Sequence, residues 1–199
     1  RNFKESFQKA LRSLEIGLDG LNSSKNLKNK KKNEILKLLE KNLPNKFLII
    51  AEALRRNIKI NIIKQKSSYD HWFIREISEI IKYEKLLKRE FNLHLYKKCK
   101  EYGFSDKRIV ELSKISERKL ENLKKIKGLG AKFRNIDTCS GEFKSLTPYM
   151  YSTWSSNFNK KNYENETDIT SKKKVVIIGG GPNRIGQGIE FDYCCVHSS

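Results

Sequence analysis

The residues with the clearest chemical potential form one run near the C-terminus. Four β-branched residues, Val175 to Ile178, lead directly into the three glycines Gly179 to Gly181. Gly186 and Gly188 follow, and then the carboxylates Glu190 and Asp192. This order predicts a buried parallel strand that ends in a tight turn, an arrangement with which many α/β enzymes begin a ligand site.

The glycine-rich run does not fit the two common nucleotide-binding motifs. A dinucleotide fingerprint that starts at Gly179 requires a third glycine where Arg184 stands. A P-loop could span Gly181 to Gly186, but Gln187 and Gly188 replace its Lys and its Ser or Thr. What remains is a turn that lets another group approach the main chain, with carboxylates beside it that can hydrogen-bond a polar ligand.

A second interpretation of this run stays open. The glycines could serve only to let a helix and a strand pack closely. Glu190 and Asp192 share one side if the segment is extended, but not if it begins a helix.

Other reactive residue types lack the spacing of a site. The histidines His71, His94 and His197 show no metal-ligand spacing, and we expect them at the surface or at boundaries. No serine or cysteine lies in a nucleophile elbow. The four cysteines suit reduced thiols, and the adjacent Cys194 and Cys195 are expected to be buried as small apolar groups.

The net charge of +19 raises the question of nucleic-acid binding. The excess is mostly lysine and is spread along the chain, whereas bidentate phosphate recognition favours arginine, so we interpret it as a solvated surface. A helix-turn-helix-like pair near residues 106–127 keeps a basic DNA-binding module as the alternative. The sequence shows no apolar stretch long enough for a membrane span and no signal peptide, and because it starts at Arg1 we expect it to be part of a longer polypeptide.

The elements before the glycine-rich run are predicted to be mostly helical. Gly17 should end the first helix, Pro44 should stop the second, and Asn45, Ser105 and Ser116 should cap later ones. We expect a loop over residues 21–33. The predicted helices cover residues 2–16, 34–41, 45–54, 70–87, 106–114 and 117–127.

Helical periodicity is lost after Leu129. Residues 129–154 suggest a packed connector, and residues 155–174 are polar and suit a surface linker. A domain boundary is therefore expected near Ser171.

The long run from Gly179 to His197 resembles the opening of the second synthetase half in the large chain of carbamoyl-phosphate synthases. Further segments resemble the same family. Residues 136–139, 142–143 and 147–153 resemble its connector, Asp70, Trp72, Phe73 and residues 50–53 its helical oligomerisation domain, and residues 6–15 the last helix of its first synthetase half.

The resemblance implies a glutamine-dependent, ATP-dependent ligase that makes carbamoyl phosphate, with a product that feeds arginine or pyrimidine synthesis. It implies two ATP molecules and Mg²⁺ or Mn²⁺ in the intact enzyme, with none bound by this fragment, which alone should be inactive. It further implies a glutaminase small chain as partner, large-chain self-association, a cytoplasmic location, and no nucleic-acid or membrane partner. Gly188 and Glu190 match residues that line the carbamate end of an internal tunnel; no catalytic residue or metal ligand is expected here.

The resulting expectation for the fold is mostly α: a helical domain followed by the first strand and glycine-rich turn of an α/β, pre-ATP-grasp domain. The expected division is 1–17, the last helix of the first half; 18–135, the helical oligomerisation domain; 136–171, connector and linker; and 172–199, the start of the carbamoyl-phosphate synthetic domain.

Overall fold

The chain is mostly helical in a computed structural model, which describes residues 2–144, 149–154, 165–167, 169–181, 188 and 190–199. The side chains of Lys25, Phe191 and Asp192 lie outside this description. The elements are α1 (Phe3–Ser13), α2 (Lys25–Lys28), α3 (Lys32–Glu40), α4 (Lys46–Arg55), α5 (Ile60–Ser67), α6 (His71–Leu87), α7 (Leu93–Glu101), α8 (Asp106–Ser113), α9 (Glu117–Ile126), β1 (Lys132–Asn135), β2 (Met150–Thr153) and α10 (Glu190–Ser198).

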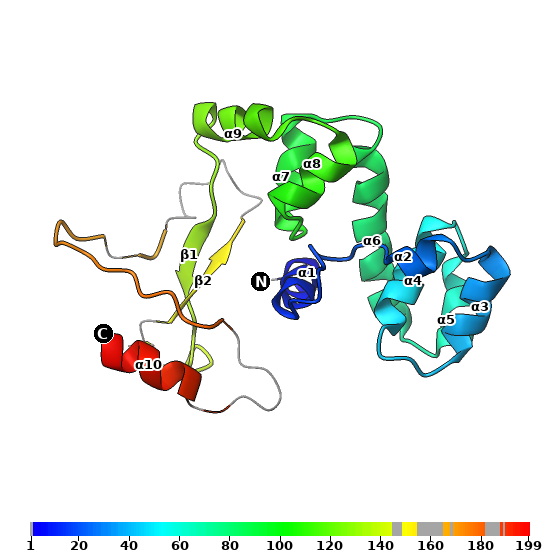
Figure 1. Ribbon diagram of the computed structural model, residues 1–199, viewed down its shortest axis with the longest axis horizontal. Helices are drawn as coiled ribbons and strands as arrows, with labels where there is room; N and C mark the ends of the chain where they lie inside the picture. Colours follow the sequence, from blue (N-terminus) through cyan, green and yellow to red (C-terminus); the bar gives the residue numbers. More distant parts are fainter. Residues whose placement is uncertain (1, 145–148, 155–164, 168, 182–187, 189) are drawn as a thin grey trace.

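Helix α6 is the central element of the helical part. It contacts α1, α4, α5, α7 and α8, while α2 and α3 pack on α4 and α9 packs on α8. In Figure 1, α2–α5 gather at one end of α6 and α7–α9 at the other. None of the described helices is long and apolar enough to cross a membrane.

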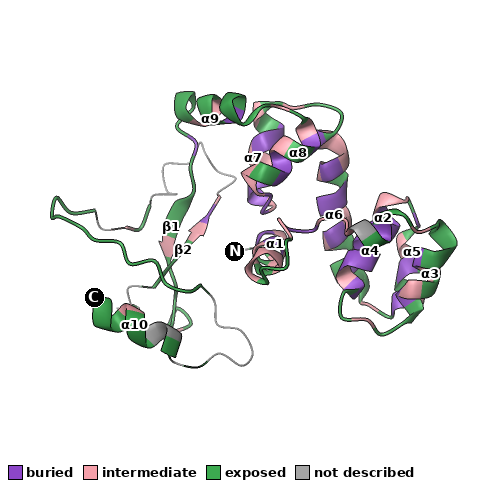
Figure 2. Ribbon diagram, viewed as in Figure 1, coloured by how far each residue is buried: buried purple, intermediate pink, exposed green. Residues whose placement is uncertain are grey.

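The apolar core follows the stripe predicted for α6. Ile74, Ile77, Ile80 and Ile81 are all almost completely buried. Their spacing of three and four residues places them on one helix face, which explains why the sequence pattern located this helix correctly. Figure 2 shows the buried residues concentrated on α6 and on the helices that face it.

Several predicted helix caps are confirmed. Ser105 Oγ accepts a hydrogen bond from the backbone N–H of Arg108 (3.0 Å), and Ser116 Oγ accepts one from that of Lys119 (3.3 Å). Asn45 precedes α4 as predicted, but its side chain makes no capping hydrogen bond.

Two predicted boundaries at the start of the chain are wrong. Helix α1 ends at Ser13 rather than at Ile16, because Glu15 already adopts a left-handed conformation (φ 53°), two residues before Gly17. The segment over residues 21–33 is not a plain loop: it contains α2 and the start of α3, and Leu21 and Leu27 are buried. Their burial against α4 supplies the apolar contact that the polar local sequence did not indicate.

Helices α5 and α7 were not predicted. In α5, Ile63 and Ser67 are buried four residues apart, while Ile60 and Ile62 leave the stripe irregular. In α7 the buried stripe is Leu95, Tyr96 and Cys99, interrupted by lysines. Tertiary packing therefore stabilises both helices where the sequence pattern is weak.

The strand predicted over Val175 to Ile178 is not formed. These residues have no regular secondary structure, and Val175, Val176 and Ile178 are 90%, 83% and 91% exposed. A strand needs a neighbour for its backbone hydrogen bonds, and the described part of the chain places none beside this segment.

The connector instead contains a small antiparallel sheet. Lys132 pairs with Thr153 and Asn135 with Met150. Asn165 and Glu166 follow the other edge of β1: Asn165 Oδ1 accepts from the N–H of Phe133 (2.8 Å), and the N–H of Glu166 donates to the Phe133 carbonyl (3.0 Å).

A buried carboxylate on α6 joins three helices. Glu84 is 2% exposed. Its Oε2 accepts a hydrogen bond from Arg55 Nε of α4 (2.8 Å), and its Oε1 accepts from Arg108 Nη2 of α8 (2.8 Å). Arg55 Nη2 also donates to the Leu21 carbonyl, so the same network holds the segment before α2.

The arginines determine the charge state of Glu84. Burial alone would raise the pKa of its carboxyl group, but the hydrogen bonds and positive charges of Arg55 and Arg108 outweigh burial and hold that pKa below its ordinary value of 4.5. A carboxyl group with a lowered pKa in the folded state stabilises the fold above its unfolded pKa, and this contribution is lost as the pH falls through the folded value.

We predict that Glu84→Gln lowers the free energy of unfolding by about 3–5 kcal/mol, because it removes the buried counter-charge that Arg55 and Arg108 share. Urea denaturation at pH 7 measures this loss. In the variant, the loss of stability on acidification below pH 4.5 should also become shallower.

Glu79→Gln on the same helix is the matched control, since Glu79 is partly exposed and its ion pair with Lys82 is long, at 3.9 Å. It should change stability by less than about 0.5 kcal/mol. Equal stabilities of the Glu84→Gln and Glu79→Gln proteins would show that the network does not hold the helices together.

Candidate functional site

The two predicted site residues lie together at the start of α10. The backbone N–H of Gly188 donates to Glu190 Oε1 (3.1 Å), and Glu190 is the first residue of the helix. Both residues are exposed. A Cβ atom at position 188 would meet the Glu190 carboxylate, so a side chain there would displace this exposed, flexible group and remove the hydrogen bond.

The local hydrogen bonds affect the Glu190 carboxylate. Donation from its own backbone N–H and from that of Gly188 lowers the pKa of this group. Glu190 is therefore an exposed, ionised hydrogen-bond acceptor. Of the two alternatives for Glu190 and Asp192, the structure shows the helical one, because Glu190–Ser198 form α10.

Two other glycines of the run serve the main chain. Gly181 has a left-handed conformation (φ 81°), which suits glycine. A Cβ at Gly179 would lie 3.1 Å from Cys195 Sγ of α10, so this position allows close packing of the turn on the helix. The packing interpretation thus has support at Gly179, while residues 182–187, including Gly186, lie outside the described residues.

In the described part of the chain, the cysteines and histidines form no second site. None of the four cysteines forms a disulfide, but the expected burial of the adjacent pair is wrong, since Cys194 is exposed and Cys195 is half-buried. The exposed histidines agree with the prediction. Among the described residues, no group of three or more His, Cys, Asp or Glu side chains could hold a metal ion.

No sequence pattern indicated the site where the connector docks on the first helix. Glu5 of α1 and Thr153 of β2 are both buried, and Thr153 Oγ1 donates to Glu5 Oε2 (2.8 Å). The backbone N–H of Trp154 donates to Glu5 Oε1 (3.4 Å), and Lys9 pairs with the same oxygen (3.1 Å). One carboxylate thus fixes the end of β2.

Side chains at the polar face of α1 also donate hydrogen bonds to carbonyl groups at the C-terminal end of α7. Asn2 Nδ2, Gln8 Nε2 and Arg12 Nη1 donate to the carbonyls of residues 101, 102 and 103 at 3.2, 2.6 and 2.7 Å. These are carbonyls that a helix C-terminus leaves without intrahelical partners. A Cβ at Gly103 would lie 2.8 Å from Glu5 Cα, so the close approach of α1 requires glycine there.

A second ionic cluster lies next to the docked connector. Asp106 accepts from Lys100 (2.9 Å), Lys124 (2.8 Å) and the Tyr96 hydroxyl (3.2 Å). Burial would raise the pKa of Asp106, but the two lysines outweigh it and lower that pKa. Lys100 Nζ also lies 4.8 Å from the ring centre of Trp154, a cation–π contact that joins the cluster to the connector.

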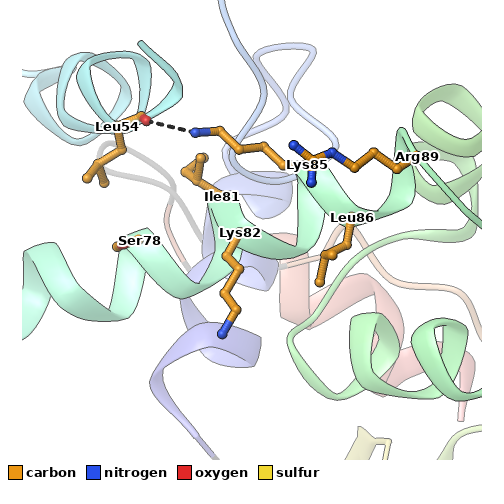
Figure 3. A pocket seen from close by; sticks show the side chains of 7 residues that line it. All are labelled: Leu54, Ser78, Ile81, Lys82, Lys85, Leu86 and Arg89. Atoms are coloured by element: carbon orange, nitrogen blue, oxygen red, sulfur yellow. Dashed lines mark hydrogen bonds between the residues drawn. The ribbon is translucent and has the colours of Figure 1, made fainter. Parts of the chain in front are cut away.

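A cationic cavity of about 290 Å³ lies between α4 and α6 (Figure 3). Lys82, Lys85 and Arg89 of the α6 region line it. Lys85 Nζ is already bound to the Leu54 carbonyl (3.3 Å) and to Asn57 Oδ1 (2.6 Å), so it ties α6 to the C-terminal end of α4. We interpret this cavity as structural.

Comparisons with known proteins cover almost the whole chain. The family model described as carbamoyl-phosphate synthetase large chain, oligomerisation domain, matches residues 1–128, including α8 and α9, and the model described as carbamoyl phosphate synthase preATP-grasp domain matches residues 171–199.

The chain is also similar to whole carbamoyl phosphate synthase large chains. It is 39% identical to that of Archaeoglobus fulgidus and 40% identical to that of Haemophilus ducreyi, each over 100% of this chain and 18% of the relative. It is 42% identical to that of Thermoanaerobacter pseudethanolicus over 98% of this chain and 18% of the relative. The chain therefore spans about a fifth of the length of these relatives.

We predict that Thr153→Val loosens the docked connector, because it removes a buried hydrogen bond to a charged carboxylate, an interaction worth about 1.5–3 kcal/mol. Hydrogen exchange should show faster exchange of the β2 backbone amides, with α6 unchanged. Thr138→Val, at an exposed position of the same connector, should leave β2 exchange unaltered. Unchanged β2 protection in the Thr153→Val protein would contradict the docking role.

Proposed function

We propose, because this chain belongs to the carbamoyl-phosphate synthase large chain family, that it joins the two synthetase halves of a glutamine-dependent carbamoyl-phosphate synthase. The observation that carries the proposal is the similarity to such large chains over 98–100% of the sequence. The reaction proposed for the intact enzyme makes carbamoyl phosphate from bicarbonate, glutamine-derived ammonia and two ATP.

The proposed division of the chain follows the expected one. Residues 1–17 end the first half, 18–135 form the helical oligomerisation domain, 136–171 connect, and 172–199 begin the carbamoyl-phosphate synthetic domain. The family models that match residues 1–128 and 171–199 support a boundary within the connector. Helix α1 packs on the helical domain. The ring centroid of Phe3 lies 5.1 Å from that of Trp72 and 5.5 Å from that of Phe73.

We assign ATP and Mg²⁺ or Mn²⁺ to the parts of the enzyme that this sequence does not include. The described residues offer neither a metal cluster nor a P-loop or dinucleotide motif that would hold these groups. The chain by itself is therefore proposed to be inactive. The proposed enzyme is cytoplasmic, with no nucleic-acid or membrane partner.

The proposed protein partners are a glutaminase small chain and a second large chain. Trp72 and Phe73, at the start of α6, support self-association because they are 43% and 38% exposed. The later apolar residues of α6 are buried or half-buried within the chain, so the proposed contact between large chains lies at the first turn of the helix.

Gly188 and Glu190 are proposed to line the carbamate end of an internal tunnel. The turn supports this role in two ways: position 188 has no side chain to narrow a passage, and the Glu190 carboxylate can accept hydrogen bonds from a small polar intermediate. Both residues are exposed in this chain, so other parts of the enzyme would have to enclose the passage.

We predict that Gly188→Leu in the intact enzyme lowers carbamoyl phosphate output by about tenfold or more, a barrier increase of about 1.4 kcal/mol. Bicarbonate-dependent ATP hydrolysis should continue, because the block lies after the first phosphorylation. The measurement compares ATP hydrolysis with carbamoyl phosphate formation in the same sample.

Gly130→Leu is the matched control, because a Cβ at Gly130 would meet nothing within 4 Å and its backbone is not left-handed. It should keep the two rates coupled. Normal product output from the Gly188→Leu enzyme would refute the tunnel role. An enzyme without bicarbonate-dependent ATP hydrolysis even before mutation would refute the ligase function itself.

A further inference from the structure

A second cationic cavity lies where α2, α4, the end of α6 and α8 meet. Its volume is about 350 Å³, at the lower end of the range for small-molecule pockets. The positively charged side chains that line it are Lys28, Arg55, Arg56, Lys88 and Arg108.

The carboxylates at this cavity already have partners. Glu52 accepts from Arg56 Nε (3.0 Å) and from Ser23 Oγ (2.7 Å). Glu111 accepts from Arg108 Nη1 (2.7 Å). Five cations and two carboxylates line the cavity, an excess of three positive charges, and Glu84 behind it compensates only one of them.

Two of the guanidinium groups keep donors without a hydrogen bond. Arg108 is 6% exposed, and its Nε has no acceptor; Arg55 Nη1 lies 3.5 Å from Glu52 Oε2 but makes no hydrogen bond. A buried polar group without a partner is costly, so such atoms point to an acceptor that the protein itself does not supply.

Two lysines at the same cavity have no internal role. Lys28 and Lys88 are exposed, and within the described part of the chain neither ammonium group makes an ion pair or a hydrogen bond. They differ in this respect from Lys85 in the cavity of Figure 3, whose ammonium group holds the end of α4.

We propose that this cavity binds a small phosphate-type oxyanion, held by Lys28 and Lys88 and by the guanidinium groups of the half-buried Arg55 and the buried Arg108. Arginine donors and lysine charges together suit an anion with several acceptor oxygens and two negative charges. The ligand is either free phosphate or a small phosphate monoester. This site is independent of the proposed carbamate passage, which lies at the other end of the sequence.

The test is isothermal titration calorimetry of the 199-residue chain with inorganic phosphate, at an ionic strength held constant with sodium chloride. Saturable binding at one site per chain is expected. Lys28→Gln and Lys88→Gln should each weaken phosphate binding about tenfold, the loss expected for one charge-assisted hydrogen bond. The double variant should weaken it by more than either single variant.

Lys125→Gln on α9 is the matched control, since it removes one exposed positive charge away from the cavity. It should leave phosphate affinity unchanged. Circular dichroism and urea unfolding of the lysine variants should match those of the parent chain, because neither lysine contributes to the packing.

A titration with phenyl phosphate distinguishes the two sources of the anion. Binding of both ligands identifies a site that admits a monoester, and binding of phosphate alone identifies a site for the free ion. The proposal fails if phosphate shows no saturable heat, or if all three single lysine variants weaken it equally, which would indicate a general effect of net charge.

Discussion

The helical part of this protein depends on one buried negative charge. Glu84 lies in the last turn of α6, between Arg55 at the end of α4 and Arg108 in α8. The buried ion pairs compensate for lost hydration only because the geometry also satisfies both carboxylate oxygens. The two groups of helices at either end of α6 are therefore linked through the carboxylate of Glu84. The arginines also donate hydrogen bonds to the Leu21 carbonyl and to Glu111.

The same arginines connect the stability of the domain with the proposed anion site. Their N–H groups that face Glu84 donate hydrogen bonds to its carboxylate, whereas Arg55 Nη1 and Arg108 Nε have no hydrogen-bond acceptor. The excess of positive charge around Arg55 and Arg108 thus arises from the packing of helices that are distant in sequence. An anion bound there would add negative charge where the fold has left cations close together.

The first helix performs a comparable function for the connector. Its polar face receives the end of β2 through Glu5 and completes the C-terminus of α7 through Asn2, Gln8 and Arg12. If the chain joins two synthetase halves as proposed, this contact places the end of one half directly against the route to the other. The apolar segment that follows, Val175 to Ile178, has no strand beside it in the described part of the chain.

Local sequence determined those elements whose signals are local. The isoleucine stripe of α6 and the caps at Ser105 and Ser116 were predicted from spacing and side-chain chemistry, and the resemblance of the residues from Gly179 to His197 indicated the family. Only the tertiary structure decided that α5 and α7 form, that Val175 to Ile178 stay exposed, and that Glu5 and Glu84 are buried. The physical reason is that capping and amphipathic spacing involve residues within one or two helical turns, whereas strand pairing and the burial of a charge depend on partners that the fold brings from elsewhere in the chain.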